Sequence, residues 1–517
     1  MKNLFLSAGF FLISITAYAQ MTEAQLDDVV ERTRKAFNVP GIAVGIIKDG
    51  KLVLAKGYGV TNIKTQEKVD ANTLFAVASN SKAMTAAALG ILVDQKKIKW
   101  EDKVIQYLPE FKMYNDYVTQ EFTIRDLLIH KSGLGLGAGD LMIWPDGHNF
   151  TPKDIIQNIK YLKPVSGFRT EYDYDNLLYI IAGEVVAKVS GVSWNEFVEK
   201  NLMEPLEMKR SATSWNRLKD TTNTIVPHVP TNGKLEVIKR YKNPIFDAAA
   251  GVQTSVNDWS KWVIAQLNRG KYGANLQNQL FSAATHREMW TPQTIMPITN
   301  MAPYTCHFKT YGLGWQLTDV NGHLQVSHTG GLDGTVTQTI LFPEDQLGII
   351  VFTNQQSGAA FNAISNSIKD AYLGFNYPDH VTALSTERKA KESNADEITD
   401  KIWAQVAQNE TNKIKVDYTK VAGEFNDPWF GTVTISTTKG KTIFTSHRSP
   451  RLTGTLHWVE GDHYAVKWYN RSLLADAHVY FKRDNDGNIS GFTMEPISPL
   501  TDFSYDFQDL NFSKIYN

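Results

Sequence analysis

The sequence predicts an α/β protein of the α+β type. An antiparallel sheet flanked by helices, with a helical lobe, is expected to precede a small all-β barrel domain. Clear strand patterns in the first three quarters of the chain lie near its two ends, at 41–55 and 311–353, and the stretch between them is mainly helical. Beyond about residue 415 the chain changes to short segments of alternating apolar and polar residues, which is typical of half-buried strands.

The first elements are a helix and a hairpin. Residues 22–37 carry apolar side chains at helical spacing, so they are expected to form a helix with one buried face. Asp49-Gly50 separates the apolar runs 41–47 and 52–55, which predicts a tight β-hairpin. A further apolar helix is expected to begin at Ser79 and to end near Asp94.

The middle of the chain is expected to form the helical lobe. Residues 123–134 predict a short helix that Thr123 opens and a glycine-containing turn ends. Helices are also predicted around 152–161, 176–189 and 257–267, and 205–245 is expected to be rich in loops and hairpins.

The last part of the first domain returns to strands. Apolar runs predict strands at 311–317, 324–328, 336–342 and 347–353, followed by a helix at 361–372. One antiparallel sheet, with the N-terminal helix and this closing helix packed on it, would bury all of these apolar faces.

Composition shifts divide the chain into four parts. We predict a signal peptide at 1–19, a large α+β domain at 20–377, a charged helical linker at 378–415 and a barrel at 416–517.

The N-terminus has the pattern of a secretory signal. Lys2 precedes an apolar stretch at 4–15 that is too short to span a bilayer, and Ala17-Tyr18-Ala19 offers small residues for cleavage before Gln20. The protein is therefore expected to be exported, either periplasmic or secreted, without stable membrane insertion after cleavage. Cys306 is the only cysteine, so no internal disulfide can form. We do not expect this thiol to act as a catalytic nucleophile.

Charge and composition exclude several classes of function. The chain has 53 basic and 54 acidic residues and a formal net charge of -1, without the basic surface that nucleic-acid binding needs. The histidines lack metal-ligand spacing, so neither a metal nor another cofactor is expected. The expected partner is a small-molecule or peptide substrate, and the sequence does not predict the oligomeric state.

Ser79 and Lys82 form the first candidate catalytic pair. Residues three apart lie on one helix face, so the hydroxyl of Ser79 and the amine of Lys82 can meet. A buried lysine with a lowered pKa can accept the proton of a serine nucleophile. By itself the pattern more often marks an N-cap serine followed by a solvated lysine.

Two further motifs change that balance. Tyr174-Asp175-Asn176 stands directly before an apolar helix, and His328-Thr329-Gly330 stands at the end of a predicted strand. With these motifs in this order, residues 22–375 resemble the serine β-lactamase and penicillin-binding protein superfamily. The closest likeness is to class C β-lactamases, D-alanyl-D-alanine carboxypeptidases and related esterases. The segments 123–134 and 311–315 add to the resemblance.

The resemblance implies a role for each motif. Ser79 would attack a carbonyl carbon and form an acyl-enzyme, while Lys82 would share its proton. Tyr174 would act as general base or proton relay, which requires a phenol pKa well below about 10. Asn176 would bind the substrate amide and help to hold Lys82. Thr329, Gly330 and Gly331 would line the substrate site, with the Gly331 N–H joining that of Ser79 to stabilise the oxyanion.

The third motif departs from the usual pattern of the superfamily. His328 stands where β-lactamases and transpeptidases carry a lysine, so the permanent positive charge that attracts a substrate carboxylate is replaced by a partial one. His328 is still expected to donate a hydrogen bond and to polarise Tyr174. This departure weakens the prediction of antibiotic hydrolysis and leaves acyl transfer intact.

Other residues near the motifs have less definite roles. His130 and Ser132 are expected to support a turn and a helix end. The segment 140–144 lies where relatives build the rim of the substrate site, although ordinary loop packing would explain it equally well. Nothing in the sequence assigns a role to Asp175 or Asp333. The barrel carries no visible catalytic constellation and is expected to stabilise the chain or to contact the substrate cleft, with binding of a small apolar ligand as an alternative.

The sequence therefore predicts an exported serine hydrolase that acts through an acyl-serine intermediate. The expected substrates are D-amino-acid peptides of cell-wall type or small esters. Two alternatives remain: a class C-like β-lactamase, and a non-catalytic penicillin-binding or sensor protein that retains the fold.

Overall fold

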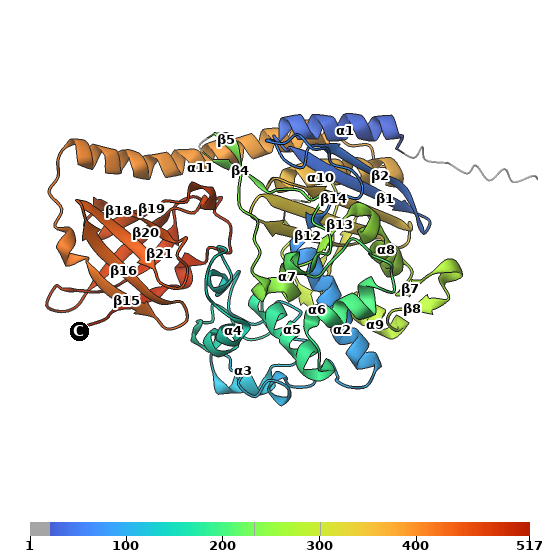
Figure 1. Cartoon of the computed structure of the whole chain (residues 1–517), viewed down its shortest axis with the longest axis horizontal. Coiled ribbons are helices and arrows are strands. Elements are labelled where there is room, and N and C mark those ends of the chain that lie inside the picture. Colours follow the sequence, from blue (N-terminus) through green and yellow to red (C-terminus); the bar gives the residue numbers. More distant parts are fainter. Residues whose placement is uncertain (1–20, 232, 300, 517) are drawn as a thin grey trace, which may run out of the picture.

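A computed structural model describes residues 21–231, 233–299 and 301–516 of the chain (Figure 1). The signal peptide predicted at 1–19 lies outside the described residues. Within them, no single helix has the length and hydropathy of a membrane span, although the bent pair 177–190 and 194–203 meets both criteria together.

The domain predicted to carry the catalytic residues, called the catalytic domain below, is built on an antiparallel sheet with the strand order β2-β1-β14-β13-β12-β11-β10-β9. Its strands are β1 (Gly41–Lys48), β2 (Lys51–Gly59), β9 (Thr294–Ile295), β10 (Lys309–Tyr311), β11 (Gln316–Val320), β12 (His323–Leu332), β13 (Thr335–Phe342) and β14 (Leu347–Thr353). The hairpin predicted around Asp49-Gly50 joins β2 and β1. The sheet order places β12, which carries the His328 motif, beside β13 at the centre of the sheet.

Helices cover both faces of this sheet. In β14, Ile349 and Val351 face the N-terminal helix α1 (Glu23–Ala36) and the closing helix α10 (Gly358–Leu373), which pack on one face. The intervening Ile350 and Phe352 point into the other core, towards α8 (Val256–Leu267). Because successive side chains of a strand point to opposite faces, a wholly apolar strand is stable here only between two helical layers. The α+β architecture is as predicted.

The helical lobe surrounds α2 (Lys82–Asp94), whose residues 82–92 are all buried. The other helices are α3 (Asp116–Glu121), α4 (Pro152–Asn158), α5 (Leu177–Ser190), α6 (Trp194–Val198), α7 (Asp247–Ala250) and α9 (Ala283–Met289). Short paired strands complete the lobe: β3 (Phe75–Ala76) with β6 (Gln253–Thr254), β4 (His228–Thr231) with β5 (Lys234–Val237), and β7 (Lys271–Tyr272) with β8 (Asn278–Gln279).

Two predicted elements of this domain are wrong. Residues 123–130 form turns instead of a helix, and the chain at their C-terminal end bonds to the distant segment 169–173: Arg169 N–H donates to the Lys131 carbonyl and Asp173 N–H to that of His130. The predicted strand 311–317 is interrupted by a turn between β10 and β11. Gly314 in that turn has φ 77°, and a Cβ there would lie 2.8 Å from the Lys82 carbonyl oxygen, so the turn fits against the start of α2.

A long helix leads to the C-terminal barrel. Helix α11 (His380–Thr411) runs along the top of the view in Figure 1, and its end packs on the barrel, where Asn409 Nδ2 donates to the Val459 carbonyl. The predicted barrel is closed in chain order by β15 (Gly423–Asp427), β16 (Gly431–Thr438), β17 (Lys441–Ser446), β18 (Thr453–Glu460), β19 (His463–Trp468), β20 (Ala477–Arg483), β21 (Ile489–Pro496) and β22 (Asn511–Lys514).

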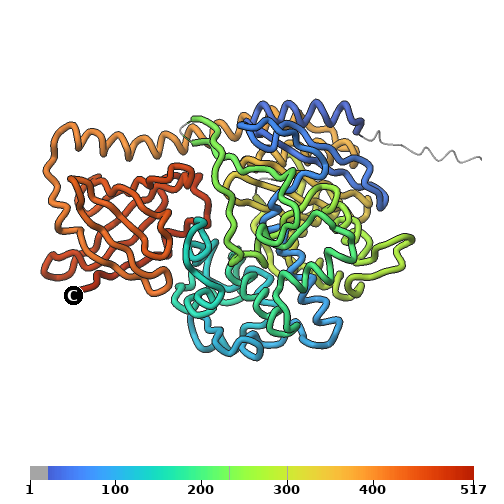
Figure 2. Tube along the Cα trace, viewed as in Figure 1, coloured from blue at the N-terminus to red at the C-terminus, as the bar shows by residue number. Residues whose placement is uncertain are grey.

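The barrel also contacts the catalytic domain directly. In Figure 2 its strands lie beside the segment that contains α4. Arg448 forms an ion pair with Asp154 at 3.1 Å and stacks over the Phe150 ring at 3.8 Å, and Asn158 Nδ2 donates to the Trp429 carbonyl. These contacts hold the barrel against the loops around residue 140, beside the predicted catalytic residues.

Candidate active site

Ser79 lies on a tight turn immediately before α2. The turn is a 3-10 helix (Ala78–Ser81), so α2 begins at Lys82 and not at Ser79 as predicted. Ala78 has φ 48°, a left-handed conformation that costs a non-glycine residue roughly 1–3 kcal/mol. The preceding Val77 is held by two hydrogen bonds. Its N–H donates to the Val252 carbonyl, and its carbonyl accepts from the Thr337 hydroxyl. The turn therefore holds Ser79 at one position above the sheet.

Lys82 is completely buried beneath Ser79. Its Nζ lies 3.1 Å from Ser79 Oγ, 2.7 Å from Asn176 Oδ1 and 3.2 Å from the Ala249 carbonyl oxygen. Burial lowers the pKa of Lys82 to about 7, although the carboxyl groups of Asp140 and Asp175 oppose the shift. The neutral amine is therefore substantially populated near neutral pH, and in that form it can take the proton of Ser79.

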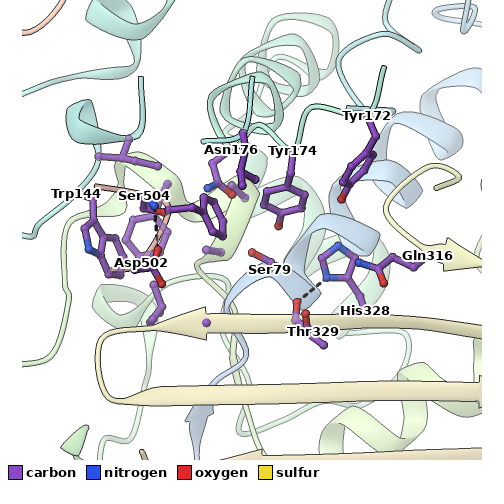
Figure 3. A pocket seen from close by; sticks show the side chains of 18 residues that line it. Ser79, Trp144, Tyr172, Tyr174, Asn176, Gln316, His328, Thr329, Asp502 and Ser504 are labelled. Atoms are coloured by element: carbon purple, nitrogen blue, oxygen red, sulfur yellow. Dashed lines mark hydrogen bonds between the residues drawn. The ribbon is translucent and has the colours of Figure 1, made fainter. Parts of the chain in front are cut away.

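Tyr174 lies beside Ser79, with its hydroxyl directed towards the serine (Figure 3). The Lys82 amine stands 4.9 Å from the centre of its ring. Burial raises the pKa of Tyr174 well above its usual value, and the hydrogen bond with Ser79 lowers it only in part. The expectation of a depressed phenol pKa is therefore wrong in this state, because burial outweighs the hydrogen bond with Ser79. Tyr174 is placed as a relay, and Lys82 is the better base.

His328 adjoins the same site but carries no charge. Burial and the nearby Lys82 lower the pKa of His328 to about 3. Its Nδ1 lies 2.6 Å from the Thr329 carbonyl oxygen, so Nδ1 carries the proton and Nε2 accepts the hydroxyl of Tyr311 at 2.9 Å. The partial positive charge expected from His328 is thus absent. Both ring nitrogens are engaged by these partners, which argues against the predicted direct polarisation of Tyr174.

The rest of the third motif lies along β12 beside the Ser79 turn. A Cβ at Gly330 would lie 2.1 Å from the Val77 carbonyl oxygen, so only glycine allows the strand to approach the turn this closely. At Gly331 a Cβ would meet nothing within 4 Å, and this residue lines the same cavity as Ser79 and Thr329. The oxyanion role of the Gly331 N–H stays a prediction.

Asn176 connects Lys82 to residues whose roles the sequence did not reveal. Its Nδ2 donates to Asp140 Oδ2 at 2.7 Å, and the same oxygen accepts the hydroxyl of Ser504 at 2.9 Å. Asp140 belongs to the segment 140–144 that was considered as a rim. Ser504 belongs to the C-terminal part of the chain, and no local pattern marks it.

Histidine 130 supports the site from below. Its Nδ1 accepts the N–H of Asp175 at 3.1 Å, and its ring lies between those of Tyr174 and Tyr311, with centroid distances of 4.3 and 4.5 Å. His130 thus has the supporting position that was expected, and it positions the Tyr174 motif. Tyr311, which the sequence placed in a motif without a role, is the hydrogen-bond partner of His328.

A cavity of about 280 Å³ opens over Ser79. Its walls are largely apolar and come from the lobe, the sheet and the C-terminal part of the chain (Figure 3). The lining residues are Ser79, Leu136, Ile143, Trp144, Tyr172, Tyr174, Asn176, Phe246, Ala249, Ala250, Gln316, His328, Thr329, Gly331, Leu332, Asp502, Phe503 and Ser504. The barrel thus contacts the substrate cleft, which was one of the roles considered for it. In the described part of the chain, no group of three or more His, Cys, Asp or Glu side chains is arranged to hold a metal ion.

Comparisons with known proteins agree with this geometry. A family model described as Beta-lactamase matches residues 26–372, and one described as a domain of unknown function (DUF3471) matches residues 409–514. The chain is 27% identical over 347 residues to the unguisins hydrolase ungD' of Aspergillus campestris, covering 65% of this chain and 62% of that protein. It is 26% identical over 341 residues to protein flp of Staphylococcus aureus strain MW2, covering 65% of this chain and 64% of that protein.

The matched segment thus spans less than two thirds of the length of these curated relatives. Among solved structures, the octameric penicillin-binding protein homologue from Pyrococcus abyssi shares the fold over 96% of this chain and 100% of its own, with a TM-score of 0.61 and 21% identity. The family match covers the domain that contains Ser79, Lys82, Tyr174 and His328. The chain therefore belongs to the β-lactamase and penicillin-binding protein superfamily of serine hydrolases.

Proposed function

We propose that this protein is an exported serine hydrolase that cleaves amide or ester bonds through an acyl intermediate on Ser79. The observation that carries the proposal is the placement of the Lys82 amine 3.1 Å from Ser79 Oγ, in a buried position that lowers the pKa of Lys82 to about 7. The fold and the family of the chain support the same class of reaction.

Acylation follows from these positions. Neutral Lys82 accepts the proton of Ser79 as Oγ attacks the carbonyl carbon, and the N–H groups of Ser79 and Gly331 stabilise the oxyanion. The carbonyl then re-forms as the bond to the leaving amine or alcohol breaks. The leaving group receives a proton from the Tyr174 hydroxyl, which regains one from Lys82. Water subsequently attacks the acyl-serine with the same groups accepting its proton, and this step releases the acid and restores Ser79.

The charged side chains that line the cavity indicate which class of substrate fits it. The lining residues include the carboxyl of Asp502, whose pKa burial raises, but neither lysine nor arginine, and His328 is neutral. Most of the wall is apolar, and Trp144, Phe246 and Phe503 are the apolar aromatic side chains in it. A substrate whose recognised end is uncharged or cationic suits this cavity better than one with a carboxylate beside the scissile bond. We therefore favour D-amino-acid peptides with a free amino terminus and small esters over β-lactams.

A substrate panel tests the proposal. The protein from Gln20 to its C-terminus, which lacks the predicted signal peptide, would be assayed with p-nitrophenyl butyrate, D-alanine p-nitroanilide and nitrocefin. The Ser79→Ala variant is the control. Turnover of the ester or the anilide that is lost in Ser79→Ala is expected. Nitrocefin turnover that exceeds both by orders of magnitude would establish the β-lactamase alternative instead.

A second measurement separates an enzyme from a non-catalytic binding protein. Intact-mass analysis after treatment with a fluorophosphonate is expected to show one adduct on the wild-type protein and none on Ser79→Ala. Absence of an adduct on the wild type would remove the nucleophile and, with it, the proposed function. Export is tested separately, by N-terminal sequencing of the mature protein, which should begin at Gln20.

A further inference from the structure

A chain of buried hydrogen bonds joins the C-terminal barrel region to the catalytic lysine. Ser504 Oγ donates to Asp140 Oδ2 at 2.9 Å, and Asn176 Nδ2 donates to the same oxygen at 2.7 Å. The other end of the Asn176 amide, Oδ1, accepts from Lys82 Nζ at 2.7 Å. All four side chains are buried. An amide that accepts at one end and donates at the other has only one favourable orientation, so Asp140 determines how Asn176 presents its oxygen to Lys82.

The segment that carries Ser504 is itself held firmly against the site. The backbone N–H of Ser504 donates to Asp502 Oδ1 at 2.9 Å. The Phe503 ring packs edge-on against the Tyr174 ring with a centroid distance of 5.7 Å. A Cβ at Gly137 would lie 2.7 Å from the Phe503 ring, so the loop of the catalytic domain and this segment touch without space for a side chain between them.

Asp506 fixes the backbone on both sides of Asp140. One carboxylate oxygen accepts the N–H of Gly139 at 2.6 Å and the other accepts that of Leu141 at 2.9 Å. The short turn that contains Asp140 (Asp140–Met142) and the preceding Gly139 are thereby attached to the C-terminal segment through three hydrogen bonds, two to backbone N–H groups and one to the Asp140 side chain. The position of the Asp140 carboxyl thus depends on residues 504–506, which lie between β21 and β22 of the barrel.

We propose that Ser504 is a positioning residue for the Ser79 reaction, which orients Lys82 through Asp140 and Asn176. The inference rests on the proposed acyl-serine function. Its consequence is that the C-terminal barrel completes the catalytic site and does more than stabilise the chain.

The ionisation of Asp140 links this arrangement to the pKa of Lys82, which a pH profile can measure. Several titratable or aromatic groups face Lys82 from the surrounding elements: Tyr174, Tyr179, Asp140, Asp175, His130 and His328. Burial raises the pKa of Asp140, and the hydrogen bonds from Asn176 and Ser504 oppose that shift, so the Ser504 hydroxyl favours the carboxylate. A carboxylate at Asp140 raises the pKa of Lys82. Loss of the Ser504 hydroxyl should therefore lower the pKa of Lys82, while the other groups remain unchanged.

The test measures the rate at which a fluorophosphonate labels Ser79 in the full-length chain as a function of pH. In this reaction the Ser79 Oγ–P bond forms, fluoride leaves, and the serine proton passes to Lys82. In Ser504→Ala the rate at the high-pH plateau is expected to fall by about three- to tenfold, the loss typical of one neutral hydrogen bond. The midpoint of the pH profile is expected to move to lower pH. Ser504→Thr keeps the hydroxyl and should restore both.

Two further variants make the test specific. Thr501→Ala removes a hydroxyl from the same segment, three residues before Ser504, and should leave rate and midpoint as in the wild type. Asp140→Asn removes the charge through which Ser504 acts, so it should lower the midpoint, and Ser504→Ala added to it should lower the midpoint little further.

The outcomes separate the inference from the proposed function. If wild type and Ser504→Ala share the same plateau rate per folded molecule and the same midpoint, the inference is wrong, even where Ser504→Ala has a lower Tm. Equal shifts in Thr501→Ala would also overturn it, because they would indicate a general effect of the segment. If the wild-type protein itself takes no label at Ser79, the proposed function fails first.

Discussion

The pH dependence of acylation follows directly from the buried position of Lys82. Lysine must be neutral to take the proton of Ser79, so the acylation rate should rise as the pH passes the pKa of Lys82, which burial lowers to about 7. One unit below that value about a tenth of the molecules carry neutral Lys82, and one unit above it about nine tenths do. The rate of fluorophosphonate labelling should therefore increase about tenfold between pH 6 and pH 8 and level off above that.

The same experiment distinguishes Lys82 from the other candidate base. Tyr174 as a phenolate would give a midpoint above about 10, because burial raises the pKa of this phenol. Lys82→Arg supplies the matched control, since arginine keeps the positive charge and does not deprotonate in this range. It should lose at least about 100-fold in labelling rate and its midpoint near neutrality. A wild-type rate that is flat from pH 6 to 8, or that rises only near pH 10, would refute the assignment of Lys82 as the base.

Three substitutions test other parts of the site by thermal unfolding and Ser79 labelling. Gly330→Ala places a Cβ 2.1 Å from the Val77 carbonyl oxygen, so it should destabilise the fold by about 1–3 kcal/mol and displace the Ser79 turn; an unchanged Tm and labelling rate would contradict this contact. Tyr311→Phe removes the donor to His328 Nε2 and leaves a buried acceptor unpaired, which should cost about 1–3 kcal/mol, measured as a lower midpoint in urea. Arg448→Ala removes the ion pair to Asp154 and the stacking on Phe150, so the free energy of unfolding should fall by about 1 kcal/mol. The labelling rate per folded molecule should stay normal, and a large fall in that rate would show that this barrel contact also positions the site.

Local patterns in the sequence were sufficient for the parts of the site that depend on local spacing. Ser79 and Lys82 meet because residues three apart share a face, and the turn geometry before α2 preserves this although the α-helix begins at Lys82. The hairpin at Asp49-Gly50 and the alternating strands of the barrel follow from turn chemistry and period-two patterns. The order of the strands in the central sheet depends on pairings between distant segments, which no local pattern contains.

Protonation states and distant partners could not be predicted in the same way. His328 is neutral and Tyr174 holds its proton because of burial, and burial arises from packing of the lobe, the sheet and the C-terminal segment together. Ser504 contacts Asp140 across a sequence separation of 364 residues, and a single serine in a loop carries no signal of its own. The segment 311–317 illustrates the same limit: its turn exists because Gly314 fits against the backbone of α2.

The burial of Lys82 in the mostly apolar helix α2 makes the stability of the fold depend on pH. Because the pKa of Lys82 falls from 10.5 to about 7 on folding, the unfolded chain binds one more proton between these values, and stability at this site rises with pH across that window. At pH 7 the burial of Lys82 costs on the order of 4 kcal/mol. Met84, Leu89, Ile91 and Leu92 of the same helix are buried, and each such side chain contributes roughly 1.5–3 kcal/mol. The burial of these apolar side chains thus offsets the free-energy cost of holding Lys82 in a site where its neutral form is populated near pH 7.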